Sequence, residues 1–273
     1  MALFESDTEH LRVDLRERVA CLTLNRPDAR NALSPELSQA LVNALQWVAW
    51  DDAVGAVMIS GTGGAFCAGG DVKAMDRSAS TTHPKLTAEQ QFQALRARHH
   101  GIAGALHALR KPSVAALPGP AAGAGMALAL ACDLRFAADT AFLSTGYARI
   151  GLSGDYGIAW LLSRIVAPAH ARALMLTSAR VPAQQALHIG LVNSVWPAAD
   201  LHDAAFAQAR ALAHGPQVAY AYIKDNLDEA LSISHPTAID READRLLKAR
   251  TTADHREAVR AFAEKREPRF TGH

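Results

Sequence analysis

The sequence predicts an α/β fold in which a parallel sheet with helical crossovers is followed by a helical C-terminal subdomain. Patterns typical of buried strands alternate with helix patterns up to residue 197, and only helix patterns follow. Such alternation is typical of parallel strands joined by helices. The chain has 273 residues, 49% of them hydrophobic, which is enough to form one core without disulfides. We therefore predict an α/β core over residues 1–197 and a helical subdomain over residues 198–273.

The N-terminal part is predicted to begin with a β-hairpin. Leu11–Leu15 and Val19–Leu24 alternate in polarity on either side of a charged turn. Ser34 can cap a following helix that has Pro35 at its first position, because leucines recur at helical spacing from Leu37 onward. The patterns beyond it predict, in order, a strand (Val54–Ser60), a glycine-rich turn (Gly61–Gly64), a surface loop (Arg77–His83), a helix (Thr87–Leu109) and a strand (Ser113–Leu117).

The second half continues the alternation and then becomes entirely helical. The alternating part predicts helices over Gly123–Ala131, Tyr156–Ile165 and Ala169–Leu176, with extended segments over Asp133–Ala137 and Leu191–Val195. Four helix patterns complete the chain, over Leu201–His214, Pro216–Leu231, Pro236–Ala249 and Thr252–Lys265. Because no strand pattern lies among these four helices, their apolar faces are expected to pack partly against neighbouring subunits.

Charge and composition disfavour several classes of protein. A formal net charge of +1, with no basic stripe, disfavours a nucleic-acid partner. No uncharged apolar run reaches about 18 residues, which disfavours a membrane span, and the first residues lack the pattern of a signal peptide. The cysteines Cys21, Cys67 and Cys132 are odd in number and lie in apolar surroundings, which is typical of reduced thiols. We expect a cytoplasmic globular protein with no nucleic-acid or membrane partner.

Two glycine-rich segments are candidates for binding a ligand through the main chain. Residues 65–71 follow the first buried strand, and residues 118–127 follow another strand and open a helix at Ala124. Small residues let a ligand approach N–H groups closely, and the first amides of a helix lack internal partners and suit a developing oxyanion. The alternatives are an ordinary turn and tight packing of a helix on a strand. A dinucleotide site is disfavoured, because Leu128 replaces the third glycine of that fingerprint.

Asp155 is the candidate for moving a proton. It precedes the predicted helix Tyr156–Ile165, where aspartate is a favoured N-cap, so a purely structural role is open beside a catalytic one. The two roles are compatible, although a capping aspartate is held ionised and is a weaker acid. His99 and His100 could be offered as the base of a hydrolytic step, but on the helix Thr87–Leu109 both are interpreted as surface residues.

Several short motifs follow one another through nearly the whole chain. They are Leu24–Pro27 with Asn31–Leu33, Phe66–Asp71, Gly119 with Gly123–Gly125, Cys132–Asp133, Gly190–Val192 and Phe262–Phe270. As an ordered set they resemble the crotonase superfamily, the enoyl-CoA hydratase/isomerase family. The resemblance implies a crotonase-like ββα superhelix, an acyl-coenzyme A thioester as substrate, and a homotrimer or hexamer assembled through the helical C-terminal subdomain. It implies no metal and no separate cofactor, since coenzyme A arrives as part of the substrate.

Matching the family's motifs residue by residue implies roles for individual positions. The N–H groups of Gly70 and Ala124 correspond to the family's oxyanion hole, which favours an enolate over the ground-state thioester. Tyr147 would contact the substrate, and Lys265 would reach the ligand of a neighbouring subunit. Coenzyme A would lie along Arg26, Ala29, Arg30, Ala68, Asp71, Val72 and Lys73.

One departure from the family's hydratases is informative. Their two glutamates, which hold and activate water, fall on Ala127 and Tyr147, and neither exchanges a proton near neutral pH. Asp155 instead occupies the position of the catalytic aspartate in the ring-1,2-epoxyphenylacetyl-CoA isomerase and dienoyl-CoA isomerase branches, and Gly154–Gly157 and Asp254–Glu257 also look like the former. A single carboxylate suits isomerisation, because it takes a proton from one carbon and returns it to another. The resemblance therefore favours an isomerase acting through Asp155.

Three alternatives stay open. The first is an enoyl-CoA hydratase with atypical active-site residues. The second follows the family's 4-chlorobenzoyl-CoA dehalogenases, which carry a nucleophilic aspartate at this position and require an aromatic pocket and a base. The third is a non-catalytic homologue that binds acyl-CoA or RNA, and the balanced charge counts against RNA.

Overall fold

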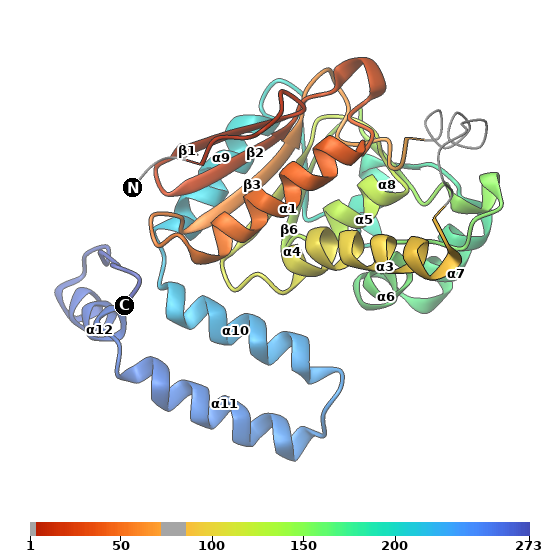
Figure 1. Cartoon of the computed structure of the whole chain (residues 1–273). Coiled ribbons are helices and arrows are strands. Elements are labelled where there is room, and N and C mark those ends of the chain that lie inside the picture. Colours follow the sequence, from red (N-terminus) through yellow and green to blue (C-terminus); the bar gives the residue numbers. More distant parts are fainter. Residues whose placement is uncertain (1–3, 72–85) are drawn as a thin grey trace.

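The computed structural model describes residues 4–71 and 86–273. Its centre is a six-stranded sheet with the order β1-β2-β3-β4-β6-β9 (Figure 1). The strands are β1 (Leu11–Arg16), β2 (Val19–Leu24), β3 (Ala56–Gly61), β4 (Ser113–Leu117), β6 (Leu134–Ala138) and β9 (Ser194–Trp196). β1 and β2 pair antiparallel, and every other pairing in this sheet is parallel. The predicted hairpin and the predicted parallel sheet are confirmed.

The hairpin turns on two residues with left-handed backbone. Arg16 pairs with Val19, so the loop consists of Glu17 and Arg18, whose φ angles are 46° and 65°. Two positive φ angles define the tight turn whose twist matches that of the flanking strands. Glycine or asparagine usually occupies such positions, so the charged pair here did not by itself reveal the turn type.

A small second sheet, which the sequence did not predict, lies beside the main one. It has the order β5-β7-β8 and consists of β5 (Ala121–Ala122), β7 (Phe142–Ser144) and β8 (Val181–Pro182). Strands of two or three residues are too short to show a period of two. This sheet has a positional role, because β5 leads directly into the helix that begins at Ala124.

The helices of the N-terminal half agree closely with the sequence prediction. Helix α1 (Pro35–Trp50) begins after Ser34, whose hydroxyl accepts a hydrogen bond from the N–H of Leu37 at 3.1 Å. The predicted helix Thr87–Leu109 is present as α3 (Ala88–His99), a π-helical turn η2 (His100–Gly104) and α4 (Ala105–His107). Thr87 caps it in a capping box with Gln90. The predicted loop Arg77–His83 lies outside the described residues.

The helices that follow differ from the prediction mainly at their ends. They are α5 (Ala124–Leu130), α6 (Ile158–Ile165), α7 (Pro168–Thr177) and the unpredicted α8 (Ala183–His188), with 3₁₀ turns η1 (Pro27–Ala29) and η3 (Tyr147–Ile150). Every residue of α5 is buried, so this short helix has apolar residues on all sides. Helix α6 starts later than predicted, because Tyr156 and Gly157 both have positive φ and cannot belong to a right-handed helix.

The C-terminal region is entirely helical, as predicted, but its first helix differs from the rest. It consists of α9 (Leu201–Ala213), α10 (Gln217–Ala230), α11 (His235–Arg250) and α12 (Ala253–Glu264). Helix α9 packs against β3 and β4, and Figure 1 shows it behind the sheet with α1 in front. Helix α10 lies along the core, joined to it by the ion pairs Arg110–Asp225 and Lys224–Asp133 at 2.8 Å each, and α11 and α12 lie farther from the sheet (Figure 1). Since α9 lies after residue 198 but packs on the sheet, the domain boundary at residue 198 stays a prediction. The α/β class with a helical C-terminal region is confirmed.

Large apolar side chains remain exposed on the last three helices. They are Ile223, Leu227, Leu231, Ile239, Leu246, Leu247, Val259 and Phe262. Phe262 is 88% exposed, which is costly for a phenylalanine that faces only water. Within the described ranges, no helix is both long and apolar enough to cross a membrane.

Candidate active site

The two glycine-rich segments predicted to bind a ligand lie against each other. Residues 65–70 and 119–125 are joined by a bridge between Cys67 and Ala121. The N–H of Ala122 donates to the carbonyl of Cys67 at 2.9 Å, and the N–H of Phe66 donates to the carbonyl of Pro120 at 3.0 Å. These contacts bring the main chain around Gly70 close to the first turn of α5.

The close approach explains the glycines in both segments. A Cβ added to Gly125 would lie 2.2 Å from the carbonyl oxygen of Cys67, and one added to Gly119 would lie 1.9 Å from that of Gly64. Real Cβ atoms do not approach so closely, so neither position admits a side chain without a backbone shift. Backbone packing thus accounts for Gly125 without a bound nucleotide.

Two unpaired main-chain donors lie where the segments meet. Ala124 is the first residue of α5, so its N–H has no partner inside the helix. Within the described part of the chain, neither this N–H nor that of Gly70 donates to a protein acceptor. A Cβ built on Gly69 would lie 3.2 Å from the Ala124 nitrogen, which shows how near the two strands of backbone are. This arrangement can stabilise a negatively charged oxygen.

Tyr147 connects this region to Asp155. The phenol of Tyr147 donates a hydrogen bond to Oδ1 of Asp155. A Cβ at Gly123 would lie 3.9 Å from Cζ of the tyrosine, so the phenol end of the ring lies beside the start of α5. Tyr147 is only 5% exposed, and this burial raises the pKa of its phenol, so the hydroxyl stays protonated and remains a donor. Asp155, Tyr147 and the unpaired donor of Ala124 therefore belong to one site.

The N-cap role considered for Asp155 is wrong. The residue at the N-cap position of α6 is Gly157, and no side chain caps this helix. The left-handed Tyr156 and Gly157 separate Asp155 from the first turn, so its carboxylate faces Tyr147 instead of the amides of α6. Only the carbonyl of Asp155 contacts the helix, where it accepts from the N–H of Ile158 at 3.0 Å. The carboxylate is thus available for chemistry without competition from a cap.

His99 is not the surface residue that the sequence predicted. Its side chain is partly buried, and its ring centroid lies 4.2 Å from that of Tyr156. Burial lowers the pKa of the His99 imidazole, an effect that the negative charge of Asp155 opposes in part. The neighbouring His100 is exposed, as predicted. A signal was present in the spacing: His99 follows Leu95 by four residues and Phe92 by seven, so it shares a helix face with both, whereas His100 does not.

A groove of about 560 Å³ runs between α3 and the start of α6. We call it the α3–α6 groove; it is lined by Phe92, Leu95, Arg96, His99, His100, Gly104, Tyr156 and Gly157. Because Tyr156 directly follows Asp155 in the chain, the groove opens next to the candidate proton-transfer group. Its volume lies within the range of small-molecule sites, although Asp155, Tyr147, Gly70 and Ala124 are not among its lining residues.

The segment predicted to hold coenzyme A is ordered by its own contacts. Arg26 donates to the carbonyl of Ala32 at 2.6 Å and forms an ion pair with Asp71 at 3.3 Å. The N–H of Ala68 donates to the carbonyl of Arg30 at 2.9 Å. Arg30 and Ala68 are exposed residues, and Ala29 is partly buried. Val72 and Lys73 lie outside the described residues. Arg26 therefore joins the two predicted ligand-binding segments to each other.

Asn31 is an important structural residue that sequence reasoning treated only as part of a motif. It is fully buried, has a φ of 58°, and its side chain makes three hydrogen bonds. It accepts from the N–H of Arg26 at 2.8 Å and donates to the carbonyls of Thr62 and Ala65 at 2.9 and 2.8 Å. A buried amide that satisfies backbone groups in two loops fixes their relative position.

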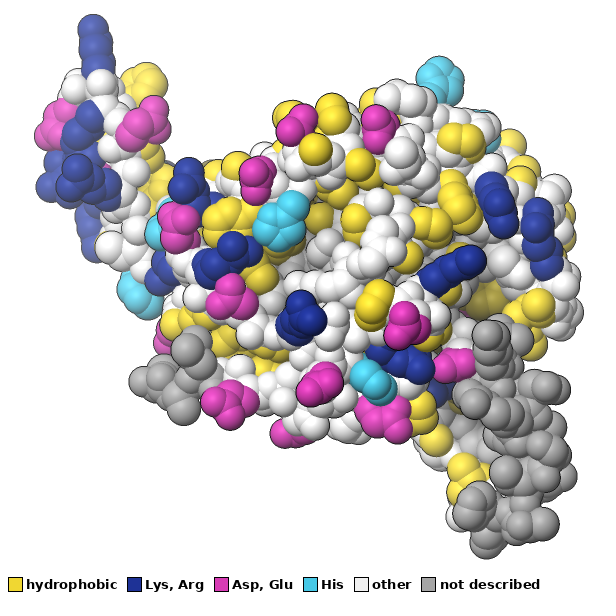
Figure 2. Space-filling view, turned by 90° about the horizontal axis from the view of Figure 1, so that it is seen from above, with side chains coloured by type: hydrophobic (Ala, Val, Ile, Leu, Met, Phe, Trp, Pro, Cys, Tyr) yellow, Lys and Arg dark blue, Asp and Glu magenta, His cyan; other side chains and the backbone are white. Residues whose placement is uncertain are grey.

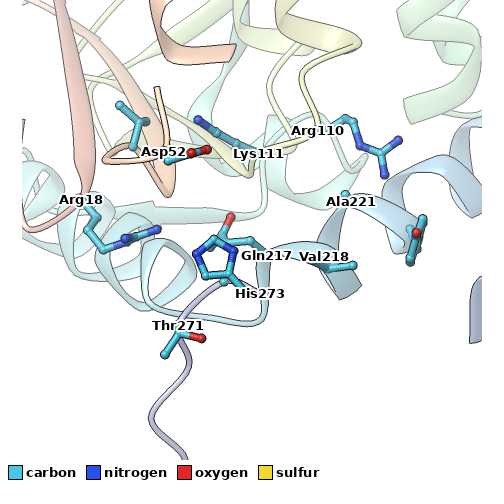
Figure 3. A pocket seen from close by; sticks show the side chains of 12 residues that line it. Arg18, Asp52, Arg110, Lys111, Gln217, Val218, Ala221, Thr271 and His273 are labelled. Atoms are coloured by element: carbon cyan, nitrogen blue, oxygen red, sulfur yellow. The ribbon is translucent and has the colours of Figure 1, made fainter. Parts of the chain in front are cut away.

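Lys265 is not brought to this site within one chain. It ends α12 in a left-handed conformation, on the region that extends away from the core (Figure 1). Figure 3 shows a separate pocket of about 250 Å³ where the C-terminal residues approach the core. Its Lys111 already donates to the carbonyls of Val48 and Asp51, both at 2.7 Å. That pocket contains none of the predicted site residues, and no metal-binding cluster occurs in the described ranges.

Comparisons with known proteins show the family of the chain. The family model for enoyl-CoA hydratase/isomerase matches residues 14–273. The chain is 34% identical to the 1,2-epoxyphenylacetyl-CoA isomerase of Escherichia coli (strain K12), covering 97% of this chain and 99% of the relative. It is 29% identical to a 4-chlorobenzoyl coenzyme A dehalogenase of an Arthrobacter species, covering 87% and 84%.

Solved structures give the same result at the level of the fold. An enoyl-CoA hydratase from Polaromonas sp. JS666 superposes with a TM-score of 0.87 at 33% identity, covering 95% of this chain and 98% of that one. The match includes the helical C-terminal region, since almost the whole of both chains is covered. Family model, relatives and structures coincide, and the chain belongs to the enoyl-CoA hydratase/isomerase family, with the crotonase fold.

Proposed function

We propose that this enzyme isomerises an acyl-CoA thioester by moving a proton through Asp155. The observation that carries the proposal is the continuous site from the unpaired N–H groups of Gly70 and Ala124, past Tyr147, to Asp155. The thioester oxygen would accept from the two N–H groups. The family processes acyl-CoA thioesters, and coenzyme A would enter as part of the substrate, with no separate cofactor.

The proposed reaction needs a single carboxylate. Asp155 takes a proton from one carbon of the acyl group, and the electron pair left behind passes into the thioester, giving an enolate whose oxygen lies on the two N–H groups. The protonated Asp155 then returns the proton to a different carbon, and the double bond shifts. The preorganised donors favour the enolate over the neutral thioester, which lowers the barrier of both steps.

Hydration by a pair of glutamates is less compatible with these residues. The two positions are Ala127, which is fully buried in α5, and Tyr147, whose phenol has a raised pKa and is committed to Asp155. Neither side chain can activate a water near neutral pH. Relatives of this chain carry both hydratase and isomerase names, so the reaction itself has to be measured.

The mass of the product separates these reactions. A panel of enoyl-CoA thioesters is incubated with the enzyme and analysed by mass spectrometry and absorbance. We expect products of unchanged mass with a changed ultraviolet spectrum, because isomerisation moves a proton without adding atoms. A gain in the mass of one water identifies a hydratase, and a panel that binds without any reaction identifies an acyl-CoA-binding homologue.

Binding of RNA remains poorly supported. On the face shown in Figure 2, Lys and Arg side chains lie among Asp and Glu side chains instead of forming a stripe. Polyanion binding depends on the neutralisation of several phosphates by neighbouring cations.

Assembly into a trimer or hexamer belongs to the same proposal. The exposed apolar side chains of α10 to α12 would be buried between subunits, and Lys265 would approach a neighbour's ligand. We expect light scattering to give the mass of a trimer or hexamer. Replacing Leu246 and Leu247 with glutamate should reduce that mass, because both are 61% exposed and a buried charge at an interface is costly. A wild-type monomer at micromolar concentration contradicts this assembly and the contact of Lys265.

A further inference from the structure

The α3–α6 groove combines exposed apolar side chains with a histidine, His99, whose Nε2 is buried and unpaired within the described residues. Phe92 and Leu95 on α3 expose 56% and 44% of their surface, and the buried Tyr156, which contacts the His99 ring, also lines the groove. Binding sites for small molecules commonly have this composition, in which apolar walls supply affinity and a few polar atoms set specificity. The polar atom of interest here is Nε2 of His99.

His99 Nε2 is buried and has no hydrogen-bond partner within residues 4–71 and 86–273. Leaving a buried polar atom unpaired is costly, so such an atom in a native protein calls for an explanation, such as a ligand or a functional role. The ring is held by its contact with Tyr156, at 4.2 Å between centroids and a tilt of 42°. The π-helical turn begins at the next residue, and such turns are frequent at functional sites.

The charge state of His99 defines what it can bind. Burial lowers the pKa of the imidazole, and Arg98 and His100 lower it further, while only Asp155 raises it. The ring is therefore neutral at neutral pH, with one nitrogen as donor and the other as acceptor. A neutral imidazole suits an uncharged oxygen, such as a hydroxyl, epoxide or ketone. It gives no particular advantage to a carboxylate.

We propose that His99 is a specificity-determining residue that selects acyl groups carrying an uncharged oxygen. This inference rests on the proposed function and names its substrate class. The thioester oxygen would lie at Gly70 and Ala124, and the acyl group would extend past Asp155 into the groove. There Phe92, Leu95 and Tyr156 would cover its apolar part, and Nε2 of His99 would hydrogen-bond its oxygen.

In this proposal His99 and Asp155 have different roles, because they contact different parts of the substrate. The proton-transfer group acts on the carbons next to the thioester, whereas His99 contacts the remainder of the acyl group. A site built to bind an oxygen rejects an analogue that lacks it, because the polar atom is then left unpaired in the complex. The expected consequence is a preference in kcat/KM between substrates that differ by one oxygen.

The test uses pairs of acyl-CoA thioesters that are identical except for one hydroxyl, epoxide or ketone oxygen on the acyl group. We expect the wild-type enzyme to prefer the oxygen-bearing member by at least roughly tenfold in kcat/KM, or in binding where no turnover occurs. In His99→Phe, which keeps a ring against Tyr156 and removes both nitrogens, the preference should fall to about one. His99→Gln restores a donor and an acceptor and should recover part of it.

The control is His188→Gln, which removes an exposed histidine on α8 and should leave the preference unchanged. The inference is overturned if the wild type treats both members equally or if His99→Phe keeps the preference. It is also overturned if a carboxylate-bearing acyl group is preferred, since the exposed Arg96 in the same groove would then be the selecting residue. If no thioester binds at all, the proposed function fails with it; if thioesters react without any preference, only the inference about His99 fails.

Discussion

Replacing Asp155 with asparagine is expected to lower kcat by about 10²- to 10⁴-fold, the usual loss when a general base is removed. Asparagine has the same shape, and its amide oxygen can still accept the hydrogen bond from Tyr147, but it cannot take up a proton at neutral pH. The variant should therefore fold and bind acyl-CoA. Steady-state kinetics, calorimetric binding and exchange of solvent deuterium into the substrate measure the three properties separately.

Comparing Asp155→Ala with Asp155→Asn separates the effect of Asp155 on turnover from its effect on the free energy of unfolding. Because Asp155 does not cap α6, Asp155→Ala should destabilise the protein mainly by leaving the buried hydroxyl of Tyr147 without its acceptor, at a cost of about 1–3 kcal/mol. Asp155→Asn should avoid most of that cost. Asp203→Asn on α9 is the matched control. Its side chain is 98% exposed but lies in the first turn of the helix near His202, so this change should cost at most about 0.5 kcal/mol and leave turnover unchanged. Near wild-type turnover by Asp155→Asn, with deuterium exchange intact, would place the base at another residue.

Replacing Ala124 with proline should lower kcat by about 10²- to 10³-fold, the loss measured when one oxyanion donor is removed from other enzymes. The change deletes a main-chain N–H without altering any other hydrogen bond, because this N–H is unpaired in the protein. Proline is favoured at the first position of a helix. A residue that precedes proline is disfavoured in the helical region of backbone space. Gly123, with a φ of 53° and a ψ of −126°, lies outside that region, so it does not conflict with a proline at position 124.

The matched control for this substitution is Ala253→Pro. Ala253 is the exposed first residue of α12, after an extended N-cap at Thr252, so proline is placed in the same helical position far from the site. Both variants should unfold within a few degrees of the wild type. If Ala253→Pro is active and Ala124→Pro is equally active, the N–H of Ala124 contributes nothing to catalysis. Loss of folding in Ala124→Pro alone would instead show that the added ring atoms do not fit the buried start of α5.

The sequence by itself determined the α/β class, the hairpin, the cap of α1 and the two glycine-rich segments that the fold brings together. These depend on local rules. Strand and helix periods are visible in Val19–Leu24 and in α1, and Ser34 caps α1 through a residue three positions away. The glycines of the two segments were also informative in the sequence, because they mark close approaches of backbone. The approach of Gly125 to Cys67 leaves no space for a Cβ atom. The family resemblance further implied that Ala127 and Tyr147 stand where hydratases have glutamates.

Only the tertiary structure decided what the side chains of the site contact. Asp155 lies next to a predicted helix in sequence, and two left-handed residues, invisible to pattern analysis, turn its carboxylate toward Tyr147 instead. His99 and His100 are neighbours on a largely polar helix, yet packing against Tyr156 leaves the first partly buried and the second exposed. Both outcomes depend on contacts between residues distant in sequence, for which local propensity carries no signal. The positions of chemical groups relative to one another are therefore a property of packing, while the elements that carry them follow from local patterns.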